Sequence, residues 1–574
     1  MTAPFKAATI QFEPTFGDKE RNVATLLAFV DEAAQAGARL ITTPEMATTG
    51  YCWYDRREVA DFVEPVPGPT TDRFASIARE RDCFVVLGMP EVDPLTNLYY
   101  NSAVLIGPDG VVGTHRKTHP YISEPKWAAS GDLGHQVFET SIGRIALLIC
   151  MDIHFIETAR LVALGGADVI CHISNWLAER TPAPYWISRA FENGCYLIES
   201  NRWGLERGVQ FSGGSCIIAP DAEVLAVIDD GDAIAYAVIE PEKARARLVM
   251  GEPVMEQRRP EMYAELMTNT FSWNPKDFFS LYGHEAIPSG RSARIAVAEM
   301  APSEVLASNL ATITALAEQA SQEGAELVVF PEQALTGLAG AAASAIEPTD
   351  PAMSALARLA ESLNLFLVVG YAEQAGETLY NSVVVLGPKG ERWNYRQIHL
   401  ATGTRIWASA GQDWLVCDLP FGRLGVLIGH DAAFPEAGRV LALRGCDLIA
   451  CPSAIATKFV MDHAGTAVSH PEPIPTGADT HHWHHYRVRA GENNCYIAFA
   501  NALHSSEPHS CFSGIFGPDT FAFPRNETII VPGQNLALAN IDIADGNSRC
   551  PVNVVRRKEL VLMRLPHHYN SLVL

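Results

Sequence analysis

Short apolar runs alternate with stretches of helical periodicity along this chain, and turn residues separate them. Residues 84–88 and 145–149 are typical of the apolar runs, and their length predicts strands. Residues 22–36 carry a helical pattern, and Gly37 stands where helices commonly end. Because strands that are apolar on both faces need cover on both sides, the pattern predicts layered α/β domains.

The whole pattern occurs twice. A strand-like run leads to Pro-Glu at Glu45 and again at Glu332, and Tyr-Asn-Ser recurs at 100–102 and 380–382. The offset is close to 280 residues over most of the match and rises to 300 near the end of each half. The second copy therefore contains an insertion of about 20 residues, which we expect within 456–480.

Duplication of one domain explains this repeat. The join is expected in the polar, proline-containing stretch 270–292. The sequence thus predicts two domains, at 1–275 and 290–574.

Composition narrows the class of protein. Hydrophobic residues at 48% and charged residues at 19% indicate a globular chain. A formal net charge of −23 argues against nucleic acid or an anionic membrane as partner, because both bind clustered Lys and Arg. We recognise neither a signal peptide nor an apolar run long enough to cross a membrane, so we expect a cytoplasmic protein.

Twelve cysteines are spread along the chain, and no two form a Cys-x-x-Cys pair. Most are expected to be reduced thiols in the core. One of them, Cys150, closes a strand-like run, and Glu45 and Lys117 also follow such runs. A nucleophile, a base and a group that holds an oxyanion are what amide hydrolysis requires.

In this order and with these flanks, Glu45, Lys117 and Cys150 resemble the Glu-Lys-Cys triad of the nitrilase superfamily of carbon–nitrogen hydrolases. Glu124 falls where that family has a second active-site glutamate. The resemblance covers nearly the whole chain, twice, and implies two tandem α-β-β-α sandwich domains of the kind that forms four-layer assemblies.

The resemblance also implies roles. Cys150 would attack a carbonyl and form a thioester, and Glu45 would act as general base. Lys117 and the backbone N–H of Met151 would stabilise the oxyanion, while Glu124 would orient the substrate or relay a proton. The small-molecule amide and water are the reactants, and neither a metal nor an organic cofactor is needed.

Substrate contacts are less well defined, because aromatic residues near the site are as readily explained by core packing. Arg202 could bind a carboxylate bidentately. Asp152 and Arg160 are expected to make structural contacts behind the site. Cys-Met-Asp at 150–152 departs from the Cys-Trp-Glu of nitrile-cleaving relatives and favours an amide or carbamoyl substrate. The candidate substrate contacts are Tyr51, Trp127, Met151, His154, Asn175, Trp176 and Arg202.

The second half retains the glutamate, Glu332, but not the other site residues. Gln397 replaces the lysine, Thr404 the second glutamate and Gly429 the cysteine. We therefore expect an inactive domain. A buried Glu332 without its lysine should have a raised pKa or a substitute cation such as Arg405.

Two questions about the second half stay open. It could supply an interface that makes one chain a pseudo-dimer, with further homo-oligomers possible, or it could bind a regulator. In the run His481-His482-Trp483-His484-His485, His481 and His485 would share a face of a helix and could ligate zinc, but a loop or interface segment is the preferred interpretation.

The leading hypothesis is cofactor-independent hydrolysis of a small linear amide or carbamoyl compound, releasing ammonia or an amine. A nitrilase that forms a carboxylic acid is the alternative within the same chemistry. A non-catalytic scaffold or small-molecule-binding protein is the alternative from another class.

Overall fold

The apolar runs form strands in the computed structural model. Residues 84–88 lie in β3 (Phe84–Val92), and residues 145–149 lie in β7 (Gly143–Ile149). The predicted helix is α1 (Lys19–Gln35), which begins earlier than the apolar pattern because Asp18 accepts a hydrogen bond from the Arg21 backbone N–H.

The structure describes residues 2–177, 181–270, 286–338, 342–456, 484–503, 513–519, 527–530, 533–544 and 553–574. The predicted insertion, most of the predicted join, and His481 and His482 lie outside these residues. The described chain forms two compact units, which divide between Val249 and Met250. No helix within the described ranges has the length and apolar character needed to cross a membrane.

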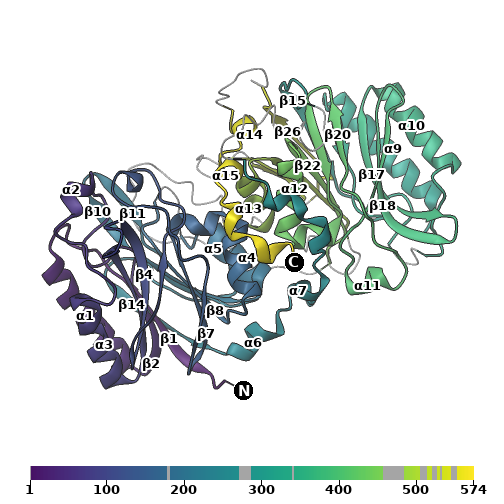
Figure 1. Cartoon of the computed structure of the whole chain (residues 1–574). Coiled ribbons are helices and arrows are strands. Elements are labelled where there is room, and N and C mark those ends of the chain that lie inside the picture. The colour runs from purple at the N-terminus through teal and green to yellow at the C-terminus, as the bar shows by residue number, and fades with distance from the viewer. Residues whose placement is uncertain are drawn as a thin grey trace. The chain divides into compact units, whose positions relative to one another are not determined.

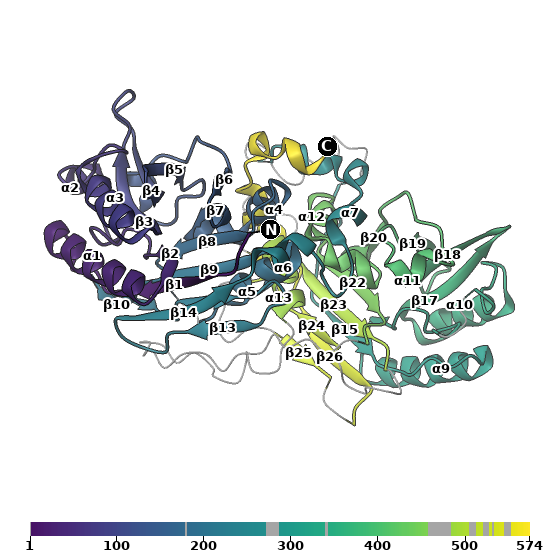
Figure 2. The same ribbon diagram turned by 90° about the horizontal axis from the view of Figure 1, so that it is seen from below.

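The first unit is a sandwich of two six-stranded sheets, ordered β14-β1-β2-β3-β4-β5 and β13-β12-β9-β8-β7-β6. Helices α1 and α3 cover the first sheet, and α4 and α5 cover the second (Figures 1 and 2). Thr42 Oγ1 lies 2.6 Å from Ser200 Oγ and joins the two inner faces. The remaining elements are α2 (Arg56–Val59), α3 (Pro69–Arg81), α4 (Ile156–Leu164), α5 (Pro184–Asn193), α6 (Pro241–Ala246), β1 (Phe5–Gln11), β2 (Ala38–Thr42), β4 (Tyr99–Gly107), β5 (Gly110–Arg116), β6 (Val137–Thr140), β8 (Val169–Ser174), β9 (Tyr196–Asn201), β10 (Trp203–Glu206), β11 (Val209–Ser212), β12 (Cys216–Ile218), β13 (Val224–Val227) and β14 (Ala233–Ile239).

The second unit repeats this architecture. Its sheets are ordered β19-β18-β17-β16-β15-β26 and β20-β21-β22-β23-β24-β25, and α9, α10, α12 and α13 form its outer layers (Figure 1). The predicted pair of tandem α-β-β-α sandwiches is therefore confirmed. The elements are α9 (Leu306–Gln322), α10 (Pro351–Leu363), α11 (Thr402–Arg405), α12 (Pro435–Leu443), α13 (His484–Asn493), α14 (Val554–Arg557), α15 (Glu559–Leu562), β15 (Ala293–Ala298), β16 (Leu327–Val329), β17 (Phe366–Ala375), β18 (Thr378–Leu386), β19 (Arg392–Arg396), β20 (Val416–Leu419), β21 (Gly422–Val426), β22 (Leu448–Ser453), β23 (Tyr496–Asn501), β24 (Gly514–Phe516), β25 (Glu527–Ile529) and β26 (Leu536–Ile541).

The segment 250–270, which contains α7 (Val254–Gln257), follows the first half in sequence but belongs to the second unit. The buried Tyr263 places its hydroxyl 2.6 Å from His399 Nε2. Arg258 donates from Nε to Glu436 Oε1 at 2.9 Å. The segment is thus held to the second unit by a buried hydrogen bond and by an ion pair.

Candidate active site

Cys150 stands where β7 ends and a short 3-10 turn (Cys150–His154) begins. Its φ of +44° lies in the left-handed region, which costs a non-glycine residue about 1–2 kcal/mol. The side chain is buried, and the backbone carbonyl accepts a hydrogen bond from His172 Nε2 at 3.0 Å. A strained residue at a strand end is a common setting for a reactive side chain.

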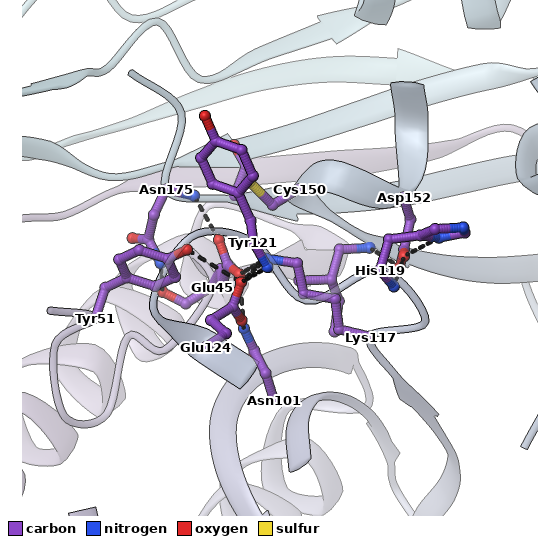
Figure 3. A network of polar contacts seen from close by, with 12 residues as sticks. Glu45, Tyr51, Asn101, Lys117, His119, Tyr121, Glu124, Cys150, Asp152 and Asn175 are labelled. Atoms are coloured by element: carbon purple, nitrogen blue, oxygen red, sulfur yellow. Dashed lines mark hydrogen bonds and ion pairs between the residues drawn. The ribbon is translucent and has the colours of Figure 1, made fainter. Parts of the chain in front are cut away.

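A buried lysine lies between two buried carboxylates next to Cys150 (Figure 3). Lys117, directly after β5, places Nζ 2.8 Å from Glu45 Oε1 and 2.6 Å from Glu124 Oε2. Glu45 follows β2, and Glu124 begins the turn Glu124–Lys126. The structure therefore brings together the four residues predicted to be catalytic.

Asn101, on β4, was not among the predicted site residues. Its Nδ2 donates to Glu45 Oε1 at 2.7 Å and to Glu124 Oε1 at 2.6 Å. The amide thus shares Glu45 Oε1 with Lys117, and it binds the Glu124 oxygen that Lys117 does not contact. The recurrence of Tyr-Asn-Ser in both halves was the available signal for this residue.

Burial and charge together set the protonation of the site. Burial raises the pKa of Cys150, and Glu45 raises it further, despite Lys117. Burial also raises the pKa of Glu45. Burial opposes the charge on Lys117, but Glu124 and Glu45 hold its pKa well above the ordinary value. The resting cysteine is therefore a thiol, and it needs a base to become a nucleophile.

Asp152 fixes the geometry between the cysteine and the lysine. Its Oδ2 accepts from the Ile149 backbone N–H at 3.1 Å, and its Oδ1 accepts from the backbone N–H groups of Thr118 at 3.1 Å and His119 at 3.0 Å. One carboxylate thus ties the end of β7 to the residues after Lys117. This is the structural contact that the sequence predicted for Asp152. Arg160, on α4, likewise donates to the carbonyl of Glu192 at 3.2 Å.

Tyr51 and Asn175, two of the predicted substrate contacts, hold the carboxylates. The hydroxyl of Tyr51 donates to Glu124 Oε2 at 3.1 Å. The backbone N–H of Asn175 donates to Glu45 Oε2 at 2.7 Å. Tyr121, whose backbone N–H donates to Glu124 Oε2 at 2.7 Å, was not predicted (Figure 3).

The other predicted contacts lie near the site in buried positions. Met151 is the buried residue after the cysteine. The His154 ring stacks on Trp176 with 4.8 Å between ring centroids, and burial lowers the pKa of His154 to about 3. Trp127 packs in an apolar cluster with Tyr51, and its indole N–H has no hydrogen-bond partner within the described residues. Their contact with substrate stays a prediction.

Arg202 is fully buried and paired with Glu206. Glu206 in turn accepts from the backbone N–H groups of Tyr51 at 2.9 Å and Cys52 at 2.6 Å. The guanidinium therefore supports the loop that carries Tyr51. A substrate carboxylate would compete with Glu206 for it.

The second unit keeps a similar polar network, but glutamine stands in place of the lysine. Asn381 Nδ2 donates to Glu332 Oε1 at 2.6 Å and to Gln397 Oε1 at 2.8 Å. Burial raises the pKa of Glu332 to about 7, which confirms the first of the two predicted outcomes. Arg405 donates from Nε to the carbonyl of Leu400 at 3.0 Å, and no ion pair to Glu332 is found within the described ranges.

Gly429 has the backbone conformation of Cys150, with a φ of +41°. A Cβ built on it would lie 2.4 Å from Glu332 Oε2, so the carboxylate fills the space where a cysteine side chain would begin. The neighbouring His430 binds Gln257 Oε1 at 2.7 Å, and burial lowers its pKa to about 4. Thr404 lies on α11.

No group of three or more His, Cys, Asp and Glu side chains is placed to hold a metal ion in the part of the chain that the structure describes. Of the histidine cluster, His485 donates from Nε2 to the carbonyl of Ala432 at 2.8 Å.

A family model described as carbon-nitrogen hydrolase matches residues 6–247 and again residues 294–520. A protein of Pyrococcus abyssi (strain GE5 / Orsay) named nitrilase is 35% identical over 261 residues, 45% of this chain and 98% of that protein. A protein of Solanum lycopersicum named N-carbamoylputrescine amidase is 32% identical over 286 residues, 46% of this chain and 94% of that protein. A solved carbon-nitrogen hydrolase from Helicobacter pylori G27 is 25% identical, with a TM-score of 0.43, over 46% of this chain and 99% of that one. Each relative is matched almost whole by about half of this chain.

Proposed function

The chain belongs to the carbon–nitrogen hydrolase family, and from this premise we propose that its first half hydrolyses a small linear amide or carbamoyl compound through a thioester on Cys150. Relatives named nitrilase and amidase support hydrolysis of a carbon–nitrogen bond in an amide or nitrile. The observation that carries the proposal is the buried Lys117, within hydrogen-bonding distance of Glu45 and Glu124 beside a buried thiol.

In the first step, Cys150 Sγ attacks the substrate carbonyl carbon while Glu45 takes the thiol proton. The raised pKa of Glu45 brings its proton affinity closer to that of the thiol, which favours this transfer. The carbonyl oxygen becomes an oxyanion, which Lys117 Nζ and the backbone N–H of Met151 stabilise. The carbon–nitrogen bond then breaks, and Glu45 returns the proton to the leaving amine.

In the second step, water attacks the thioester while Glu45 accepts one of its protons. The carbon–sulfur bond breaks, the acid product leaves, and the proton returns to Cys150 Sγ. Glu124 keeps Lys117 charged and placed through both steps, and it orients the substrate amide. Because protons move within one buried cluster, the site changes little in net charge.

The preference for an amide or carbamoyl group rests on Cys-Met-Asp at 150–152, which departs from the Cys-Trp-Glu of nitrile-cleaving relatives. Tyr51, His154, Asn175 and Trp176 are among the proposed substrate contacts. Nitrile hydrolysis is the second candidate, because the relative at 35% identity bears the name nitrilase. The second half is proposed to be structural, since Gly429 offers no nucleophile.

A panel of primary amides, N-carbamoyl amines and nitriles tests these proposals. Ammonia or amine release is followed together with the intact mass of acid-quenched protein, where an acyl adduct on Cys150 is expected. In ¹⁸O-labelled water an amide gives an acid with one labelled oxygen, whereas a nitrile gives an acid with two. The label count therefore separates the two candidate reactions.

Cys150→Ala should abolish both turnover and the adduct. Cys83→Ala, at another buried cysteine of the first unit, is the matched control and should keep both. Turnover that survives Cys150→Ala would contradict the nucleophile assignment. A wild-type chain that forms no adduct and releases no amine from the panel would favour the non-catalytic alternative.

A further inference from the structure

A buried ion pair lies directly behind the candidate nucleophile. His172 on β8 and Glu199 on β9 are partners in the register of these parallel strands. His172 Nδ1 pairs with Glu199 Oε2, and the hydroxyl of Ser174 donates to Glu199 Oε1. All three side chains are fully buried. The proposed reaction uses none of them directly.

The other ring nitrogen, His172 Nε2, lies 3.0 Å from the backbone carbonyl oxygen of Cys150. A carbonyl oxygen can only accept a hydrogen bond, so Nε2 carries the hydrogen. Burial lowers the pKa of His172, but Glu199 outweighs this effect and raises it. Glu199 therefore fixes the ring with its Nε2–H directed at Cys150.

The hydrogen bond to this carbonyl also acts on the next residue. The carbonyl of Cys150 and the N–H of Met151 belong to one planar peptide group, so fixing one fixes the direction of the other. A donor on the carbonyl also polarises the peptide and strengthens its N–H as a donor. The N–H of Met151 is the group assigned to the oxyanion in the proposed function.

The second unit shows that the fold does not need this pair. The same strand positions carry Cys451 and Phe499, which are partners in the matching register of β22 and β23. Gly429 nevertheless keeps the left-handed turn, with a φ of +41°. The pair is therefore present in the half that holds a cysteine at this turn and absent from the half that lost it.

We propose that His172, held by Glu199, is a positioning residue that aims and polarises the Met151 N–H toward the oxyanion. This inference rests on the proposed function of Cys150 and Met151. It assigns the pair a role in stabilising the transition state rather than in ionising the thiol.

The test exchanges the pair for the residues of the second unit, in the variant His172→Cys/Glu199→Phe. Two reagents probe Cys150 in the full chain, and peptide mass spectrometry locates the product. p-Nitrophenyl acetate acylates the sulfur through an oxyanion and releases p-nitrophenolate. Iodoacetamide alkylates the sulfur by direct displacement of iodide and forms no oxyanion.

Acylation of Cys150 in the variant is expected to slow by about tenfold to a hundredfold, as for a weakened oxyanion donor, while alkylation stays within about threefold. Equal slowing of both reactions, or no slowing of acylation in a folded variant, would overturn the proposal. Cys451→Ala in the second unit is the control and should change neither rate.

A conservative pair of variants covers the case in which the double variant does not fold. His172→Gln can place an amide N–H near the position of Nε2, whereas the shorter His172→Asn cannot reach it. Acylation should therefore be better preserved in the glutamine variant, and equal rates would contradict the assignment. The reagents need no natural substrate, so selective slowing supports the pair even if the amide panel gives no turnover. A wild-type Cys150 that reacts with neither reagent would refute both proposals.

Discussion

Replacing Glu332 with glutamine is expected to stabilise the second unit by an amount that grows with pH. Burial raises the pKa of Glu332 from 4.5 to about 7. Below pH 4.5 the acid is neutral in both the folded and the unfolded chain. Between these values the unfolded chain releases the proton first, so stability falls as pH rises. At about 1.4 kcal/mol per pKa unit the full loss is roughly 3 kcal/mol above pH 7.

Glutamine has no proton to lose, and its amide oxygen can still accept from Asn381. The variant should therefore resemble the wild type near pH 4.5 and exceed its stability by roughly 3 kcal/mol at pH 8. For a unit of about 300 residues, at about 2 cal/mol/K of unfolding entropy per residue, that gain corresponds to a rise of roughly 5 °C in the unfolding temperature. Calorimetry of the full chain between pH 5 and 8 measures the change, and the transition of the first unit should not move.

Glu373→Gln, in the same unit, is the matched control, and its expected effect on stability has the opposite sign. Burial would raise the pKa of Glu373, but hydrogen bonds from Arg396 and Ser382 hold it below the ordinary value. This carboxylate contributes stability above the unfolded pKa, so glutamine should destabilise the unit at pH 8. A lower transition in Glu332→Gln at pH 8, or a gain that does not change with pH, would refute the reasoning.

Three further substitutions probe the two networks. Lys117→Gln introduces the residue of the second half and should lower kcat at least about a hundredfold, because the oxyanion and both carboxylates lose their cation. Near wild-type turnover in steady-state assays would exclude a role of Lys117 in stabilising the oxyanion. Asn101→Leu should lower the unfolding free energy of the first unit by about 1–3 kcal/mol, because two buried carboxylates lose a hydrogen-bond donor. If water replaced the amide, calorimetry would show no shift in the unfolding temperature. Gly429→Ala should destabilise the second unit by about 1–3 kcal/mol, because the added Cβ would clash with the Glu332 carboxylate and alanine would have to adopt a left-handed backbone conformation. An unchanged melting temperature would contradict this clash.

The fold was predictable because each half repeats one pattern of apolar runs. The repeat also distinguished Cys150 from the other cysteines, because the second half has Gly429 at the same position and has also lost other site residues. A single copy would not allow this comparison. Helix α1 begins at Lys19, before the apolar pattern, because the capping residue Asp18 lies outside that pattern. Local chemistry of this kind moves the ends of elements without changing their order.

The polar contacts around the site were less predictable. Asn101 reaches Glu124 across a turn that the apolar pattern does not describe. His172 and Glu199 meet through the pairing of parallel strands, and their separation in sequence is unrelated to any local period. Arg202 was predicted from its own charge, whereas its surroundings depend on Glu206 in the same hairpin. Side-chain partners that depend on strand register are therefore the part that sequence reasoning missed.

The docking of residues 250–270 on the second unit determines where this chain can be divided. A cut after Val249 leaves residues 250–270 with their partners in the second unit. A cut at 275 separates Tyr263 from His399 and Arg258 from Glu436, and it exposes apolar and charged surface on both products. Proteolytic cleavage, or a fusion of another hydrolase to the second unit, would therefore give products of different stability at these two positions, which lie about 25 residues apart.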